Sequence, residues 1–426
     1  MTAPASSRDQ AGDARPALLI IGTGSRDYRE YLLASIGTRY RVHLLLGTEP
    51  TWEPDYVTSW SVLGNMGETI DAAEMTEAAR QAAASQPLDG VLTWDEARVL
   101  QAAKVAAALG LPGGDPDAAM RCRDKHLTRE ALATAGVPQA RSVLVASLDE
   151  ALNAAGQIGY PVVLKPRAMA ASLGAVLVAG PGELADRFAF ARDTTVPGAW
   201  RYDAGVLVEE YLTGPEVSVD CAVHGGRVFP LFVARKQIGY PPYFEEVGHV
   251  VDARDPLLAD TEVLRVVQDA HTAIGLADGM THAELKLTPA GPKIIEINGR
   301  LGGDLIPYIG MRASGIDPGL AAAAVACGRP PVLAPDRELI GAVRFFYVER
   351  DDTRIESVSF DQAALPKAVD AAVPLARPGK IVSPPPKGTF GGRIAYATAV
   401  AQTERECREA LDAAQAALTV RTAPGE

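Results

Sequence analysis

The chain has 426 residues, of which 47% are hydrophobic and 22% charged, and its formal net charge is −12. This length and composition are typical of an enzyme-sized protein with two or three domains. The acidic balance argues against nucleic acid as the main partner, because neutralising phosphates requires a basic surface. The sequence contains no run of ~18 apolar residues that could span a membrane, so we expect no membrane partner.

The first 16 residues contain no apolar run like that of a secretory signal, and we expect them to form a disordered tail. We therefore place the protein in the cytoplasm. The four cysteines lie far apart, show no zinc-type spacing and should stay reduced in that compartment. They are Cys122, Cys221, Cys327 and Cys407.

Residues 17–118 alternate short apolar runs with helical patterns, which is typical of a parallel sheet covered by helices. The predicted strands are 17–22, 42–46 and 90–94, and the predicted helices are 69–84 and 96–109. The stretch LPGGDP at 111–116 interrupts this pattern, so we place a domain boundary near residue 118. The sequence predicts a Rossmann-like α/β domain over 17–118.

Residues 119–330 have the mixed pattern of an α+β domain. Its predicted helices are 124–135, 148–158, 182–192, 257–274, 307–314 and 318–327. Its predicted strands are 142–145, 162–165, 175–179, 206–210, 248–252, 281–287 and 293–298, with antiparallel strands within 216–236. A Pro-rich stretch at 328–338 marks the next boundary, so 331–426 should form a small α+β domain with strands at 342–348 and 393–397 and a helix at 404–418.

The most informative stretch is THAELKLTPAGPKIIEIN at 281–298. If TPAGP turns the chain and the register is symmetric about Ala290, Glu284 opposes Glu296 and His282 opposes Asn298. All four side chains then share one face, because side chains alternate along a strand. Opposed glutamates repel each other unless a cation lies between them, and Mg²⁺ prefers such oxygen ligands. The alternatives are a solvated strand face or one glutamate with a raised pKa.

Arg300 follows this hairpin in the glycine-rich turn GRLGGD. A guanidinium there could hold a carboxylate or a phosphate with two hydrogen bonds. The alternative is a solvated loop residue.

Two lysines are candidates for phosphate binding. Lys165 ends the apolar run YPVVLKP, where a buried ammonium is costly without an anion. The small-residue loop that follows could present Ser172 and the backbone of Gly174 to phosphate oxygens, although the chain contains no GxxxxGK[ST] loop. Lys125 lies near the start of a predicted helix, where the dipole also favours an anion, and its alternative is a surface position.

The stretch VLVEEYLTGPEVSVD at 206–220 predicts two strands joined by a bend. The bend could present backbone groups to an adenine edge, and Glu216 beyond it could accept hydrogen bonds from ribose hydroxyls.

In this order, the two lysines, EEYLTGPE at 209–216, and Glu284 with Glu296-Ile297-Asn298 resemble the ATP-grasp superfamily over roughly residues 17–330. The resemblance implies the ATP-grasp fold, with a lid at about 140–212 and a loop at 167–174 that closes over the triphosphate. It implies that Lys125 and Lys165 contact phosphates, that Glu209, Tyr211 and Leu212 line the adenine pocket, and that Glu216 binds ribose. Mg²⁺ or Mn²⁺ would be held by Glu284, Glu296 and Asn298.

A narrower resemblance is to the L-amino-acid ligases, carried by YFEEVGH at 243–249, THAE at 281–284 and NGRLGGD at 298–304. It implies that Glu246 and His249 contact the substrate amine or the acyl phosphate, and that Arg300 holds the reacting carboxylate or transferred phosphate. Lys236 would add a phosphate contact. Some dipeptide ligases carry an aromatic residue near position 304, where this chain has Asp304.

The implied activity is an ATP-dependent ligase that activates a small carboxylate as an acyl phosphate and couples it to an amine. Such a transfer depends on positioning and on charge neutralisation, a lid to exclude water, and a base, for which Glu246 and His249 are candidates. The alternatives are a D-amino-acid ligase, a biotin-carboxylase-like enzyme, a non-catalytic ATP sensor, and an oxidoreductase suggested by IIGTG at 20–24. In the last case Asp27 stands where a full GxGxxG requires glycine. We expect a homodimer only because homodimers are the commonest oligomers among proteins in general.

Overall fold

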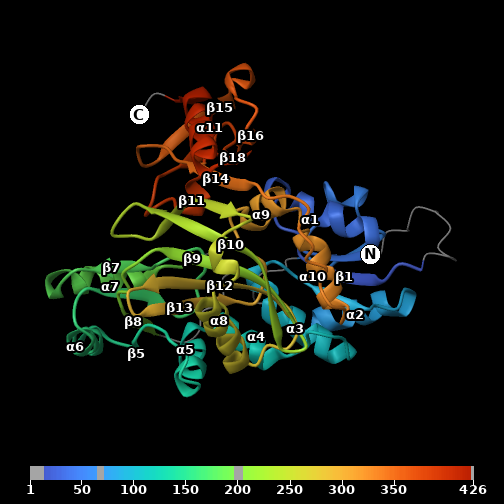
Figure 1. The fold of residues 1–426 in the computed structure, drawn as a ribbon, viewed down its shortest axis with the longest axis horizontal. Helices are drawn as coiled ribbons and strands as arrows, with labels where there is room; N and C mark the ends of the chain where they lie inside the picture. Colours follow the sequence, from blue (N-terminus) through green and yellow to red (C-terminus); the bar gives the residue numbers. More distant parts are fainter. Residues whose placement is uncertain (1–13, 65–71, 196–204, 424–426) are drawn as a thin grey trace.

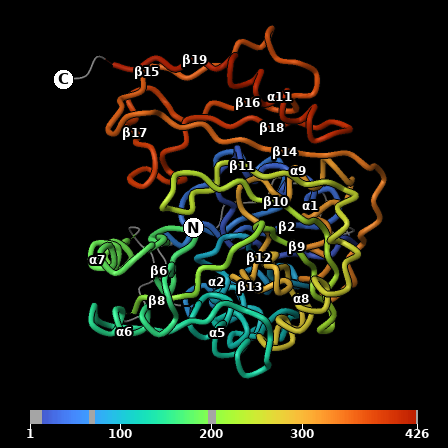
Figure 2. The backbone as a smooth tube through the Cα atoms, turned by 60° about the vertical axis from the view of Figure 1, so that its left-hand side comes forward, coloured from blue at the N-terminus to red at the C-terminus, as the bar shows by residue number. Residues whose placement is uncertain are grey.

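The computed structural model describes residues 14–64, 72–195 and 205–423. Residues 1–13 of the predicted tail, and 69–71 of one predicted helix, lie outside the described residues. Figure 1 shows three regions: an N-terminal unit on the right, a lobe at the lower left formed by residues of the predicted lid, and the C-terminal residues at the top. The tube in Figure 2 follows the same chain from another side.

The N-terminal unit is the predicted parallel sheet, with strand order β3-β2-β1-β4 and helices packed on it. Strand β1 is buried along its whole length, as expected of a central parallel strand. The unit also contains one helix and one strand that the periodicity did not reveal, α1 and β3. Its elements are β1 Ala17–Ile21, α1 Arg26–Arg39, β2 Arg41–Leu46, β3 Ser59–Val62, α2 Ala72–Ser85, β4 Gly90–Leu92 and α3 Val99–Leu109.

The lid is a four-stranded antiparallel sheet of order β5-β8-β6-β7, covered by two helices. It has a hydrophobic core of its own, which includes Leu164, Phe188 and Val208. Two short helices lead into it from the N-terminal unit. These elements are α4 Pro116–Arg123, α5 Lys125–Thr134, β5 Ser142–Val145, α6 Leu148–Ile158, β6 Val162–Pro166, β7 Val176–Val178, α7 Leu184–Asp193 and β8 Val206–Glu210.

The centre of the molecule is an eight-stranded sheet of order β13-β12-β9-β10-β11-β14-β18-β16. Period-two alternation gives its first strands two different faces. On β12, Ala283 and Leu285 pack in the core beneath helix α8. The residues that alternate with them, His282, Glu284 and Lys286, face a pocket. The elements here are β9 Glu216–His224, β10 Arg227–Gly239, β11 Glu245–Asp252, α8 Thr261–Ile274, β12 Gly279–Thr288, β13 Gly291–Asn298, α9 Ile306–Ser314 and α10 Pro318–Ala326.

The boundary predicted at residue 331 implies a C-terminal domain with a sheet of its own. In the structure, only part of the C-terminal region forms a separate sheet. Strands β14, β18 and β16 extend the central sheet, and a three-stranded sheet of order β17-β15-β19 lies beside them. The predictions for 331–426 included only two of the six described strands, because the other four are mostly half buried or exposed and lack a continuous apolar run. These elements are β14 Ile340–Phe346, β15 Thr353–Phe360, β16 Val369–Pro374, β17 Ile381–Val382, β18 Ala395–Ala401, α11 Glu404–Ala417 and β19 Leu418–Thr422.

Two further expectations concern membranes and thiols. Among the described residues, the helices are all too short or too polar to cross a membrane. The four cysteines are free, as predicted.

Candidate active site

A pocket lies where the lid meets the central sheet. It receives side chains from α5, the lid, the bend after β8, the site face of β12 and β13, and the turn before α9. Most of the predicted site residues line it together. They are Lys125, Lys165, Ser172, Glu209, Tyr211, Leu212, Glu216, Glu246, Glu284, Glu296, Asn298 and Arg300.

The predicted pairing across the β12–β13 hairpin is confirmed: Glu284 lies opposite Glu296, and His282 opposite Asn298. The simple symmetric register is wrong nearer the turn, where Thr288 pairs with Gly291. A β-bulge between these regions shifts the register by one residue. The bulge allows Ile294 to stay in the core while Glu296 faces the pocket.

Glu284 is held by two cationic side chains. Its carboxylate lies 2.9 Å from the Lys236 ammonium and 3.3 Å from His282 Nε2. His282 is buried and bound on its other side to Asp220 at 2.5 Å. Burial would lower the pKa of His282, but Asp220 and Glu284 outweigh burial and raise it to about 9, so His282 carries a positive charge at neutral pH.

Glu296 is paired with Lys125 at 2.9 Å. Lys125 is the first residue of α5, whose N-cap Asp124 accepts a hydrogen bond from the backbone N–H of His126. The Lys125 ammonium also donates to the carbonyl oxygen of Met169 in the loop after β6. One lysine thus connects the acidic hairpin with the loop that was predicted to close over phosphates.

Lys165 is 6% exposed and lies 2.7 Å from Glu209. Arg129 holds the same carboxylate with two hydrogen bonds, of 2.7 and 3.0 Å. Burial would raise the pKa of Glu209, but the two cations lower it to about 2. Glu209 lines the pocket, and its carboxylate forms an ion pair with Lys165.

The loop that follows Lys165 turns sharply. Ala171 and Ser172 adopt positive φ angles of 53° and 54°, and Gly174 one of 76°. A Cβ on Gly174 would lie 2.6 Å from Pro166, so glycine is required there by packing. Ser172 lines the pocket, whereas Gly174 does not. The contact with phosphate that was predicted for Gly174 stays a prediction.

The side chain of Lys236 is fully buried among three carboxylates. Its ammonium lies 2.7 Å from Glu246, 2.9 Å from Glu284 and 3.4 Å from Glu216. The three anions outweigh the effect of burial and raise its pKa well above the usual value. Glu216 is also paired with Lys286 at 3.1 Å, so the residue predicted to bind ribose lies between two lysines.

Arg300 lines the pocket and is held from the N-terminal unit. Its Nε lies 2.6 Å from Glu96, and the other oxygen of Glu96 lies 2.6 Å from Arg123. Burial would raise the pKa of Glu96, but Arg300 and Arg123 lower it to about 2. The Nε edge of the Arg300 guanidinium is therefore oriented by a carboxylate whose pKa lies well below its usual value.

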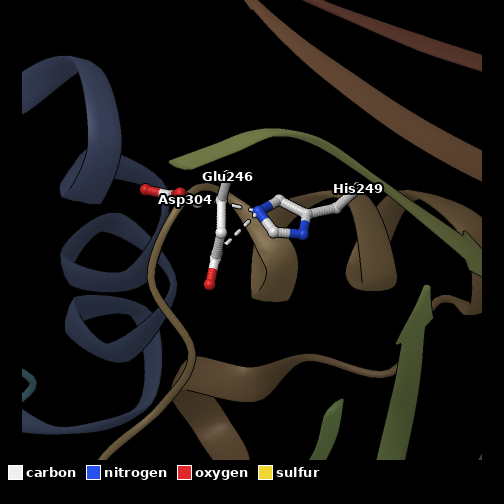
Figure 3. Close-up of side chains that lie close together, drawn as sticks. All are labelled: Glu246, His249 and Asp304. Atoms are coloured by element: carbon white, nitrogen blue, oxygen red, sulfur yellow. Dashed lines mark ion pairs between the residues drawn. The ribbon is translucent and has the colours of Figure 1, made fainter. Parts of the chain in front are cut away.

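Figure 3 shows Glu246 and Asp304 converging on His249. His249 Nε2 lies 3.3 Å from Glu246 and 3.5 Å from Asp304. The ring is fully buried and is not part of the pocket wall, so Glu246 and Asp304 lie between His249 and the pocket, and the predicted contact of His249 with substrate stays a prediction. Burial alone would lower the pKa of His249, but Asp304 and Glu246 raise it.

These charges bear on the predicted general base. Burial would raise the pKa of Glu246, but Lys236 and His249 lower it. A lowered pKa makes the Glu246 carboxylate a weaker base, so it is better suited to orienting an amine than to accepting its proton.

The donor set fits a hard divalent cation. Glu284 and Glu296 present carboxylate oxygens from opposed strands, and Asn298 adds an amide on the same face. Two other sets bring three ligand atoms within 4.8 Å of one another: Glu246, His249 and Asp304, and Glu216, Glu246 and Glu284. Both of these sets also contain a protein cation, Arg393 beside Asp304 and Lys236 beside Glu246. The same is true of Glu284 and Glu296, which lie beside Lys236 and Lys125.

Several residues around the pocket were not predicted. Lys286 could have been found, because it continues the alternation of His282 and Glu284. Arg129, Glu96 and Arg393 could not, because each lies far from its partner in the sequence and carries no local motif.

Two family models match the chain. Residues 158–308 match the ATP-grasp domain, and residues 45–113 match the ATP-grasp N-terminal domain. The first includes most of the predicted lid and the acidic hairpin, and the second includes β3, α2, β4 and α3 of the N-terminal unit.

Curated relatives match at moderate identity. An uncharacterized protein of Sinorhizobium fredii, y4rH, is 28% identical over 404 residues, which is 93% of this chain and 81% of that protein. The alanine–anticapsin ligase of Bacillus subtilis is 29% identical over 241 residues, or 52% of this chain. The matched region spans 50% of that ligase.

Among solved structures, the L-amino acid ligase of Bacillus licheniformis has a TM-score of 0.77 at 21% identity. The match covers 96% of this chain and 99% of that one. It shows that the two chains share one fold from the N-terminal sheet to the C-terminal strands.

Proposed function

Because the chain belongs to the ATP-grasp superfamily, we propose that it is an ATP-dependent ligase that joins a carboxylate to an amine. The observation that carries this proposal is the opposed Glu284 and Glu296 in a pocket that also contains Lys125, Lys165 and Arg300. Acidic residues that hold a cation, lysines that face phosphates and an arginine that faces a carboxylate are the parts that phosphoryl transfer to an acid requires.

The first step is attack of a carboxylate oxygen on the γ-phosphorus of ATP, which breaks the bond to ADP and forms an acyl phosphate. Lys125 and Lys165 neutralise the phosphate oxygens, and Arg300 orients the attacking carboxylate. Glu284, Glu296 and Asn298 would hold a divalent cation, which would supply further positive charge.

In the second step the neutral amine nitrogen attacks the acyl carbon, and phosphate leaves with the oxygen that the acid supplied. The proton that the nitrogen loses is taken up by the departing phosphate. Glu246 orients the amine, and the lid excludes water that would hydrolyse the acyl phosphate. The net products are an amide, ADP and phosphate.

We further propose that both substrates are amino acids. The support is the relative whose name is alanine–anticapsin ligase and a fold shared with an L-amino acid ligase. The cytoplasmic location, the homodimer and the roles of individual site residues stay predictions.

The test is a matrix of amino-acid pairs incubated with ATP and Mg²⁺, scored by phosphate release and by the mass of the product. The proposal predicts phosphate release that requires both partners and a product mass equal to their sum less one water. Release that requires bicarbonate would favour a carboxylase. ATP binding without release for any pair would favour a sensor.

A further inference from the structure

Arg393, which lies just before β18, contacts both segments that carry the predicted substrate groups. We propose that Arg393 is a positioning residue for ligation, which fixes the distance between the turn after β13 and the start of β11. This inference rests on the proposed function for its kinetic consequence, but its structural part can be tested without activity.

The guanidinium of Arg393 is 5% exposed and uses all three of its nitrogens. Nη1 and Nη2 bind the two oxygens of Asp304 at 2.6 and 2.7 Å. Nη2 also donates to the backbone carbonyl of Glu246 at 3.1 Å, and Nε donates to the hydroxyl of Tyr347 at 3.0 Å. A single planar group therefore connects the turn that contains Asp304 with the strand that begins at Glu245.

The turn needs such support because its backbone is strained. Asp304 and Leu305 adopt φ angles of 52° and 63°, in the left-handed region. Residues other than glycine rarely adopt this conformation, which persists only where the surroundings fix it. Asp220 accepts from the backbone N–H of Gly302 at 3.3 Å, and Arg393 holds the other end of the turn.

The second segment carries Glu246 and His249. Arg393 does not touch their side chains, but it holds the Glu246 backbone and the Asp304 carboxylate that lies 3.5 Å from His249. Glu246 and Asp304 both line the pocket, whereas Arg393 does not. Arg393 therefore acts on a substrate through these two residues, which Figure 3 shows side by side.

Lysine cannot replace these contacts. The two bonds to Asp304 require the planar fork of arginine, and the Arg393 guanidinium carbon lies 3.7 Å from the centroid of the Phe345 ring. An ammonium offers neither the fork nor the stacking surface.

The experiment compares Arg393→Lys and Arg393→Met with Arg312→Met. Arg312 is a matched control, because it also joins the segment after β13 to a C-terminal strand, through Asp370, but lies outside the pocket wall. Both Arg393 variants should lower kcat/KM for the amino-acid substrates about 100-fold, since misplacing reacting groups by about 1 Å has this effect. The KM for ATP should change less than about twofold, and Arg312→Met should stay close to wild type.

Asp304→Asn supplies a second line of evidence. If the two residues act as one unit, the double variant with Arg393→Lys should lose no more activity than either single variant. Additive losses, wild-type-like kinetics of Arg393→Lys, or an equal loss in Arg312→Met would each overturn the inference.

Hydrogen–deuterium exchange separates this inference from the proposed function. Arg393→Lys should increase exchange at 299–305 and at 244–249 relative to wild type and to Arg312→Met. An inactive wild-type protein would contradict the proposed function and leave this exchange test in place. Unchanged exchange in both segments would contradict the role of Arg393.

Discussion

Nearly every carboxylate in the pocket has a protein cation beside it, as the pairs Glu296–Lys125 and Glu284–Lys236 illustrate. Such pairs keep like charges from repelling one another. We expect the binding of ATP and a divalent cation to turn the same lysines to phosphate oxygens and the same carboxylates to the cation.

The first prediction concerns the acidic pair. Glu296→Ala should reduce amine-dependent phosphate release by about 10³-fold or more, because the carboxylate that would hold the cation is lost. Glu130→Ala, which removes an exposed carboxylate of α5, should leave the rate unchanged. Near-normal turnover in Glu296→Ala would contradict the metal assignment.

The second prediction concerns Glu245, a buried neighbour of the pocket. Burial raises its pKa to about 7, despite the hydrogen bond from Tyr347 and the nearby Arg393. The folded state therefore holds a proton that the unfolded chain releases near its ordinary pKa of about 4.5. The bound proton therefore stabilises the folded state. This contribution of about 3 kcal/mol to the free energy of unfolding is fully present below pH 4.5 and is lost as the pH rises through about 7.

Glu245→Gln keeps the shape of the neutral side chain and cannot titrate. The stability of wild type relative to Glu245→Gln should therefore fall between pH 5 and pH 8, as measured by thermal unfolding of both proteins in the same buffers. Parallel profiles of the two proteins would show that Glu245 has an ordinary pKa.

At the scale of elements, the β12–β13 hairpin shows what local sequence can and cannot predict. Alternation and the turn signal were enough to pair Glu284 with Glu296. No feature of the sequence predicted the bulge near Ile295. The turn that pairs Thr288 with Gly291 shifts the register by one residue from the prediction, and the bulge shifts it back, so the predicted pairing is right at Glu284 and Glu296. The carbonyl groups of the bulge are satisfied by Arg129, which donates to Ile294 and Ile295.

Arg129 also binds Glu209 and thus connects α5, β8 and β13. Replacing it by methionine leaves a buried carboxylate with one cation fewer and two carbonyls without a donor. Arg129→Met should therefore lower the free energy of unfolding by about 3–5 kcal/mol, as measured by chemical denaturation. The control is Arg141→Met, whose pair with Glu210 is largely exposed and should contribute less than about 1 kcal/mol. Equal effects would contradict a connecting role for Arg129.

At the scale of the whole molecule, three parts of the chain build one pocket. The lid supplies Lys165 to the pocket wall, whereas the N-terminal unit supplies Glu96 behind Arg300 and the segment before β18 supplies Arg393 behind Asp304. The order of motifs predicted the lid and the central residues, because those follow one another in sequence. It could not predict Glu96 or Arg393, because their partners are brought to them only by the packing of the complete chain.

Nucleotide binding across these parts should stabilise the chain. At a concentration of ATP and Mg²⁺ about 100 times Kd, the folded state should gain about 2.7 kcal/mol, seen as a rise in Tm. Excess EDTA, or Glu296→Ala, should remove most of the increase. A rise that is independent of divalent cations would contradict the proposed metal site.

The central claim is that ATP activates a carboxylate by transferring its γ-phosphoryl group to it. The most direct measurement uses an amino-acid substrate labelled with ¹⁸O in its carboxylate, together with ATP, Mg²⁺ and the amine partner. The released phosphate should contain one ¹⁸O atom, because the acyl oxygen leaves with the phosphoryl group. Product formation with unlabelled phosphate, or with the label in AMP, would contradict it.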